Sequence, residues 1–143
     1  MDTRNGQWDQ LFMRFANDVA NMSSAKRLKV GAVAVRDRRV IAIGYNGTPP
    51  GEDNCCEYVN SDGELVTKDS VIHAEANLIK FSGENGIDLK HCVLYITHSP
   101  CPLCAVKIYE AGFSEIVYGK QFRDTSALKR MSDVLGIKVR EWN

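Results

Sequence analysis

Two short motifs hold residue types that can bind a metal and move a proton. His73-Ala-Glu75 is followed, 25 positions after Glu75, by Pro100-Cys-Pro-Leu-Cys104. A Cys-x-x-Cys at a helix start brings two sulfurs about one turn apart, where the positive end of the helix dipole favours thiolates. With His73 as third ligand, a tetrahedral zinc would keep one position open for water, as catalytic zinc sites do. Glu75 could then reach that water without being a ligand.

Each motif alone has commoner explanations. A lone Cys-x-x-Cys is also typical of a redox dithiol or of half a structural zinc site, and a lone helical histidine is usually a core residue. The combination His-x-Glu…Pro-Cys-x-x-Cys is far more restrictive, and it is the signature of the zinc deaminases. We therefore expect one catalytic Zn²⁺ on His73, Cys101 and Cys104, with Glu75 as general acid and base. The backbone groups around Ala74 and Ser99 are expected to hold the edge of the substrate's nucleobase.

The elements that must position these motifs follow from hydrophobic periodicity. Helices are predicted over 8–22, 74–81, 102–111 and 126–135, and strands over 30–35, 40–43, 92–97, 115–119 and 137–140. Strands that alternate with helices after an opening hairpin predict a single three-layer α/β/α domain over 1–143, with its later strands parallel. Residues 44–70 show no periodicity, so a functional or disordered loop is expected there.

The amino-acid composition indicates which class of partner the protein binds. The 143 residues carry 18 basic and 18 acidic side chains, whereas a protein that binds nucleic acid polymers normally has a basic excess. A small-molecule substrate is therefore favoured. No apolar run approaches the roughly 20 residues of a membrane span, and the first ten residues do not resemble a signal peptide. Five cysteines in such a chain indicate reduced thiols or metal ligands, so a cytoplasmic protein with no membrane partner is expected.

Beyond the zinc motif, the chain resembles the deoxycytidylate (dCMP) deaminases of the cytidine-deaminase superfamily, from about Trp8 to Val139. The matching pieces are Val30-Gly-Ala-Val33, Gly44-Tyr-Asn-Gly47, Asn54-Cys-Cys56, Ile72-His-Ala-Glu-Ala-Asn77 and Tyr95-Ile-Thr-His-Ser-Pro-Cys101. The resemblance implies a five-stranded mixed sheet with both zinc-bearing helices on one face. It also implies hydrolysis of dCMP to dUMP and ammonia, which feeds thymidylate synthesis.

The resemblance also suggests residues that contact the substrate. By position, Asn46 corresponds to the residue that holds the sugar hydroxyl, and Tyr118 is a candidate wall of the base and sugar pocket. For the 5′-phosphate we expect the basic cluster of Lys26, Arg27 and Lys29, because Arg forks onto phosphate oxygens and Lys adds a point charge. The simpler alternative is that each of these charges is only solvated surface.

Control by effectors is a further implication of the resemblance, which predicts a homohexamer activated by dCTP and inhibited by dTTP. The candidate effector residues are Tyr45, Asn46, Gly47, Phe81 and Glu84. The alternative is that the long loop is only a lid over dCMP.

Some relatives carry a second, structural zinc, which we do not expect here. The segment before the first strand has no cysteine and the long loop no histidine, and Cys55 and Cys56 alone cannot close a tetrahedral site.

Two other functions remain open on the sequence. One is another deaminase of the superfamily, acting on tRNA adenosine or on a free nucleoside or base. The other is a nucleotide-binding regulator with a purely structural zinc, which an intact Glu75 beside an open metal position disfavours.

Overall fold

A five-stranded mixed sheet forms the centre of the molecule. The computed structural model describes residues 4–121 and 125–142. The sheet order is β2-β1-β5-β6-β7, and the strands are β1 (Gly31–Arg36), β2 (Arg39–Tyr45), β5 (Val93–His98), β6 (Glu115–Lys120) and β7 (Lys138–Glu141). Strand β1 runs antiparallel to β2 and β5, whereas β5, β6 and β7 are parallel. The predicted α/β class and five-stranded mixed sheet are confirmed.

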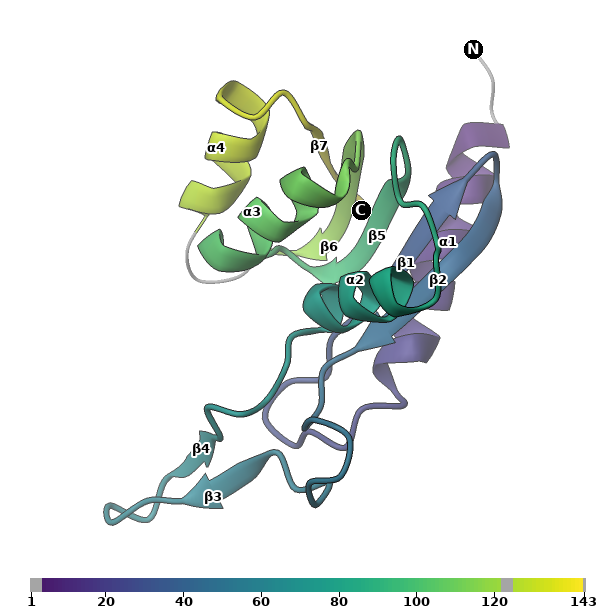
Figure 1. Ribbon diagram of the computed structural model, residues 1–143. Coiled ribbons are helices and arrows are strands. Elements are labelled where there is room, and N and C mark those ends of the chain that lie inside the picture. Colours follow the sequence, from purple (N-terminus) through teal and green to yellow (C-terminus); the bar gives the residue numbers. More distant parts are fainter. Residues whose placement is uncertain (1–3, 122–124, 143) are drawn as a thin grey trace.

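Helices cover both faces of the sheet (Figure 1). Helix α1 (Arg4–Ala20) packs on one face, and α2 (Ala74–Glu84), α3 (Pro102–Ala111) and α4 (Ser126–Asp133) pack on the other. Because side chains alternate along a strand, β1, β5 and β6 each contribute residues to two hydrophobic cores. Val33, Tyr95 and Val117 pack with α1, while Ala32 and Ile116 pack with the other three helices.

Local sequence explains where the two motif-bearing helices begin and end. Helix α3 starts with Pro102, whose missing N–H costs nothing at a helix start, and it ends at Gly112 in the left-handed conformation. Helix α2 runs three residues beyond the predicted end at Phe81, because Gly83 is accommodated within the helix and does not stop it. None of the helices in the described residues is long and apolar enough to cross a membrane.

Two glycines allow helices to approach the β1–β2 hairpin closely. A Cβ added at Gly31 would overlap the backbone of α1 at Ala16 and Ala20. A Cβ added at Gly44 would overlap Ala74 O and Leu78 N of α2. The first turn of α2, which follows His73 directly, therefore rests on strand backbone.

The expectation of a structureless segment over 44–70 is wrong in part. This segment contains β3 (Glu57–Val59) and β4 (Leu65–Thr67), an antiparallel pair that forms a separate two-stranded sheet. Strands of three residues are too short to show a periodicity. We call residues 48–71 the hairpin arm. An isolated bridge between Gly47 and Ile72 closes its neck, and its strands project away from the main sheet (Figure 1).

Candidate active site

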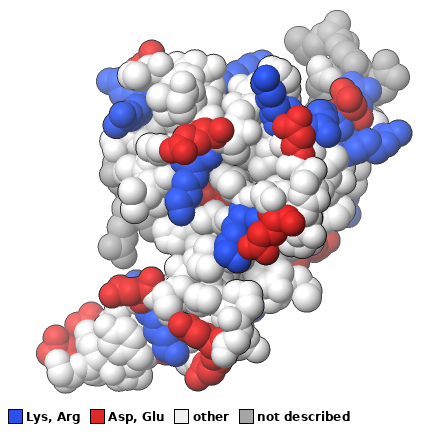
Figure 2. Space-filling model, viewed as in Figure 1, with Lys and Arg blue, Asp and Glu red and all other residues white. Residues whose placement is uncertain are grey.

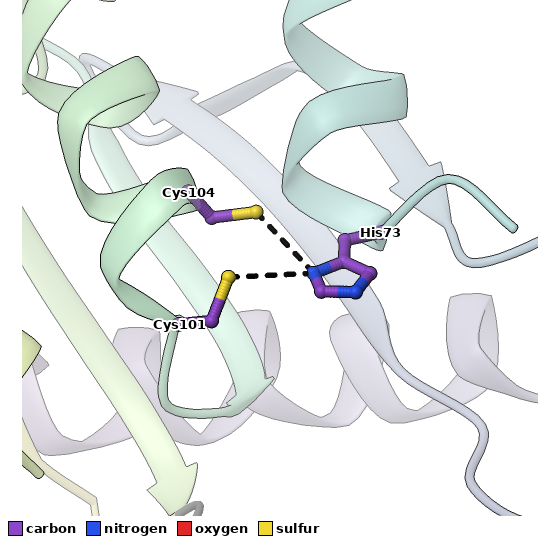
Figure 3. Close-up of side chains that lie close together, drawn as sticks. All are labelled: His73, Cys101 and Cys104. Atoms are coloured by element: carbon purple, nitrogen blue, oxygen red, sulfur yellow. Dashed lines mark hydrogen bonds between the residues drawn. The ribbon is translucent and has the colours of Figure 1, made fainter. Parts of the chain in front are cut away.

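His73, Cys101 and Cys104 meet at the starts of two neighbouring helices (Figure 3). His73 is the residue before α2, Cys101 the residue before α3, and Cys104 lies in the first turn of α3. Nδ1 of His73 lies 3.6 Å from Sγ of Cys101 and 3.4 Å from Sγ of Cys104. In a tetrahedral zinc site with ordinary bond lengths, such N and S ligands stand about 3.6 Å apart. The donor set and its spacing therefore fit zinc.

The three groups compete for the same protons. Hydrogen bonds from Cys104 and then from His73 lower the pKa of Cys101 to about 3. The hydrogen bond to Cys101, together with burial, raises the pKa of Cys104, and the bond to Cys101 also raises the pKa of His73. Zinc binds thiolate and neutral imidazole, so a bound cation would displace these protons and satisfy all three groups.

Glu75 lies in the first turn of α2, beside this group, and only 4% of its surface is exposed. Burial raises the pKa of its carboxyl, and this effect outweighs the opposing contributions of its own N–H, of His73 and of Cys104. A raised carboxyl pKa makes proton uptake more favourable than in a solvated glutamate, which suits a group that takes up a proton and then releases it. Among the described residues, Glu75 is not part of the group of three that could share a metal.

A cavity of about 490 Å³ joins these residues to other segments of the chain. Its lining consists of Arg27, Leu28, Val30, Asn46, Thr67, Val71, His73, Ala74, Glu75, His98, Ser99 and Cys101. This volume is within the usual range for small-molecule sites. The cavity is therefore large enough for a ligand that reaches both the metal group and the basic side chain of Arg27.

The structure brings four expected substrate contacts to this cavity: Arg27, Asn46, Ala74 and Ser99. Ala74 opens α2, so its N–H has no acceptor within the helix. The N–H of Ser99 donates to Lys120 O at 2.8 Å, which holds the residue just after β5 against the end of β6.

The side chain of Asn46 already has structural partners. Its Oδ1 accepts from the Val30 N–H at 2.9 Å, and its Nδ2 donates to Leu28 O at 2.8 Å. These bonds hold the segment before β1 against the end of β2. Asn46 therefore shapes the cavity wall, and it keeps one further N–H for a ligand.

Three expected contacts, Lys26, Lys29 and Tyr118, are not among the lining residues. Tyr118 is buried in the core beneath α3 and α4, on the same face of β6 as Ile116. Alternation along the strand explains this placement, because residues two apart point the same way.

The candidate effector residues Tyr45, Phe81 and Glu84 also lie outside the lining. Tyr45 and Phe81 are partly exposed, and Glu84 pairs with Lys80 at 2.6 Å. Gly47 forms the neck of the hairpin arm with Ile72.

Sequence reasoning did not single out His98, Thr67 or Val71 as cavity residues. His98 ends β5, three residues before Cys101, and that position beside the motif was a usable signal. Thr67 and Val71 belong to the hairpin arm, and no local pattern indicates that the arm returns to the metal group.

Known proteins resemble this chain in sequence and in fold. Residues 6–120 match the family model of the cytidine and deoxycytidylate deaminase zinc-binding region. The deoxycytidylate deaminase of Schizosaccharomyces pombe is 34% identical in an alignment that covers 94% of this chain and 44% of that protein. The deoxycytidylate deaminase of Mycobacterium phage D29 is 36% identical over 80% of this chain and 95% of that protein.

A solved structure agrees over the whole length. The crystal structure of dCMP deaminase from cyanophage S-TIM5, in complex with dCMP and dUMP, superposes with a TM-score of 0.87 and 33% identity over 99% of both chains. The present chain spans less than half of the fission-yeast relative but nearly all of the phage enzyme. The chain belongs to the cytidine and deoxycytidylate deaminase family.

Proposed function

We propose that this chain catalyses the hydrolytic deamination of dCMP to dUMP and ammonia, as a single catalytic domain over 1–143 with one zinc per chain. The observation that carries the proposal is the zinc-compatible spacing of His73, Cys101 and Cys104 beside the buried Glu75. The phage and yeast relatives that are named as dCMP or deoxycytidylate deaminases support the choice of substrate.

The reaction replaces a C–N bond by a C–O bond at C4 of cytosine. When bound, zinc supplies the Lewis acidity that makes water nucleophilic at neutral pH. Glu75 takes a proton from the attacking water and delivers it to ring N3. It then passes the second water proton to the exocyclic nitrogen, so that the C4–N bond breaks and ammonia leaves. The raised pKa of Glu75 suits it to both transfers.

Arg27 is our candidate for the 5′-phosphate. It lines the same cavity as Glu75, and its Nη1 lies 3.4 Å from Oγ1 of Thr67 in the hairpin arm. The guanidinium is therefore placed where it can donate to phosphate oxygens. Asn46 is retained as the candidate for the sugar hydroxyl through its remaining N–H.

The proposal includes control and assembly as the resemblance implies: a cytoplasmic homohexamer, activated by dCTP and inhibited by dTTP, whose dUMP feeds thymidylate synthesis. Initial rates against dCMP with and without each triphosphate test the control. Sigmoidal rates that dCTP makes hyperbolic and dTTP makes more sigmoidal would support it. Hyperbolic rates with competitive inhibition by dTTP would contradict it.

Ammonia release from dCMP, CMP, deoxycytidine and cytosine tests the reaction itself. We expect dCMP to be the best substrate by kcat/KM. Loss of a phosphate held by charge-assisted hydrogen bonds weakens binding by about 1.5–3 kcal/mol, or roughly ten- to a hundredfold. Comparable kcat/KM values for deoxycytidine and dCMP would refute the nucleotide assignment and favour a nucleoside deaminase.

A further inference from the structure

The base of the hairpin arm is firmly attached to the body. Gly47 and Ile72 exchange two backbone hydrogen bonds at the neck, at 3.1 and 2.8 Å. Glu57 is buried, and its Oε2 accepts from the N–H groups of Lys26 and Arg27 at 2.8 and 3.0 Å. The arm therefore has a defined direction relative to the sheet.

The outer half of the arm exposes large apolar side chains. Val59 and Leu65 are cross-strand partners, so they lie on one face, and they are 65% and 41% exposed. Tyr58, on the opposite face, is 50% exposed. A two-stranded ribbon is at best marginally stable in water unless a further surface packs on it. These side chains therefore indicate a surface that is covered in the working protein.

The charge of the arm indicates what covers it. Residues 48–71 contain six acidic side chains and one lysine, whereas the rest of the chain contains twelve acidic and seventeen basic residues. Lys68 lies 4.0 Å from Asp53, and Asp62 and Glu64 near the tip form no ion pair with a described residue. Figure 2 shows mostly acidic side chains over the arm. A complementary partner surface must therefore be apolar with a basic excess, and the remainder of another copy has that excess.

We propose that the hairpin arm of one copy docks on the body of a second copy of this chain. Docking buries Tyr58, Val59 and Leu65 and sets Asp62 and Glu64 against basic side chains. The inference rests on the self-association in the proposed function but on no step of its reaction. Because Thr67 of the arm lines the cavity, docking also fixes one wall of each active site.

Sedimentation velocity over a range of concentrations tests the docking. We expect the unmodified chain to associate, and the triple variant Tyr58→Thr, Val59→Thr, Leu65→Thr to dissociate with a constant about tenfold higher or more. The matched control compares two single variants, Val59→Thr and Val134→Thr. Val134 is 71% exposed, but it lies at the end of α4 and not in the arm. Val59→Thr should weaken association and Val134→Thr should not.

A second variant, which changes charge, tests the docking even if the triple variant does not fold. Asp62→Lys with Glu64→Lys changes only exposed side chains near the tip, and it should also weaken association. Self-association of the unmodified chain should weaken as salt is raised. A single-chain mass for the unmodified protein, or an unchanged mass for both arm variants, would overturn the docking. Deamination of dCMP by such a protein would leave the proposed reaction intact, so the two failures are distinguishable.

Discussion

The Thr97 hydroxyl lies within hydrogen-bond distance of Nδ1 of His98, 2.9 Å away, and it accepts a hydrogen bond from the Gly31 N–H at 3.1 Å. Thr97 is buried, so its hydroxyl hydrogen needs an acceptor, and we infer that Nδ1 of His98 supplies it. The imidazole therefore carries its proton on Nε2. Burial, with a smaller contribution from Lys120, lowers the pKa of His98 and keeps the ring neutral near pH 7. His98 thus offers one N–H donor to the cavity.

We expect that donor to contact dCMP. Gln places an amide N–H close to the position of Nε2, so His98→Gln should bind dCMP nearly as well as the unmodified chain. His98→Leu should raise KM for dCMP roughly tenfold or more if the acceptor is a phosphate oxygen, because hydrogen bonds to charged groups contribute about 1.5–3 kcal/mol. Steady-state kinetics with dCMP and deoxycytidine check this. An equal KM change for both substrates would show that the donor contacts the nucleoside and not the phosphate.

Removal of the proton carrier should leave the metal in place. Glu75→Gln keeps the shape of the side chain but cannot shuttle a proton, so kcat should fall about 10²–10⁴-fold. Zinc content, measured by elemental analysis, should stay at that of the unmodified chain, whereas His73→Ala should lose zinc. Loss of zinc from Glu75→Gln in step with activity would make Glu75 a metal ligand.

The proposed phosphate contact distinguishes the role of Arg27 from the roles of its basic neighbours Lys26 and Lys29. Arg27→Ala should raise KM for dCMP about ten- to a hundredfold and leave kcat/KM for deoxycytidine nearly unchanged. Lys29→Ala is the matched control, because Lys29 is not among the lining residues, and its KM for dCMP should not change. If Lys29→Ala weakens dCMP binding as strongly as Arg27→Ala does, the phosphate is held by the field of the whole cluster.

Two glycines of the same chain should respond oppositely to alanine. Gly44→Ala places a methyl group against the backbone of α2 at Ala74 and Leu78, and we expect a loss of about 3 kcal/mol in the free energy of unfolding. Gly83→Ala meets nothing within 4 Å inside α2, and it should gain up to about 1 kcal/mol. Denaturant titrations of both variants give these values, and a stable Gly44→Ala protein would contradict the close approach.

An ion pair on the α1 face should leave a signature at acid pH. Burial alone would raise the pKa of Asp9, but hydrogen bonds from Arg140 and Tyr95 outweigh it and lower the pKa below 3.8. The stabilisation from this pair is therefore complete above about pH 3.8 and is lost as pH falls through the folded-state pKa. The stability deficit of Asp9→Asn relative to the unmodified chain should be constant near neutral pH and should shrink below 3.8. A deficit that grows on acidification would contradict the lowered pKa.

Local spacing predicts part of this molecule well. The zinc motif needs only the distances between His73, Cys101 and Cys104 along two helix starts, and hydrophobic periodicity locates the five strands of the main sheet. The placement of Tyr118 depends on which face of β6 it occupies, and position at a strand end does not reveal that. Thr67 reaches the cavity only because the arm folds back beside Arg27, through contacts distant in sequence that no local pattern encodes.

Because Gly47 and Ile72 form a bridge at the neck of the arm, the position of His73 does not depend on the length of the arm. Both ends of the arm leave the body at one point, so residues can be added or removed beyond the bridge without moving the histidine that follows it. Extending a loop whose ends are already closed costs little, since the entropic cost grows only with the logarithm of its length. The tip of the arm, beyond Val59 and Leu65, can therefore change its length while the metal group stays where it is.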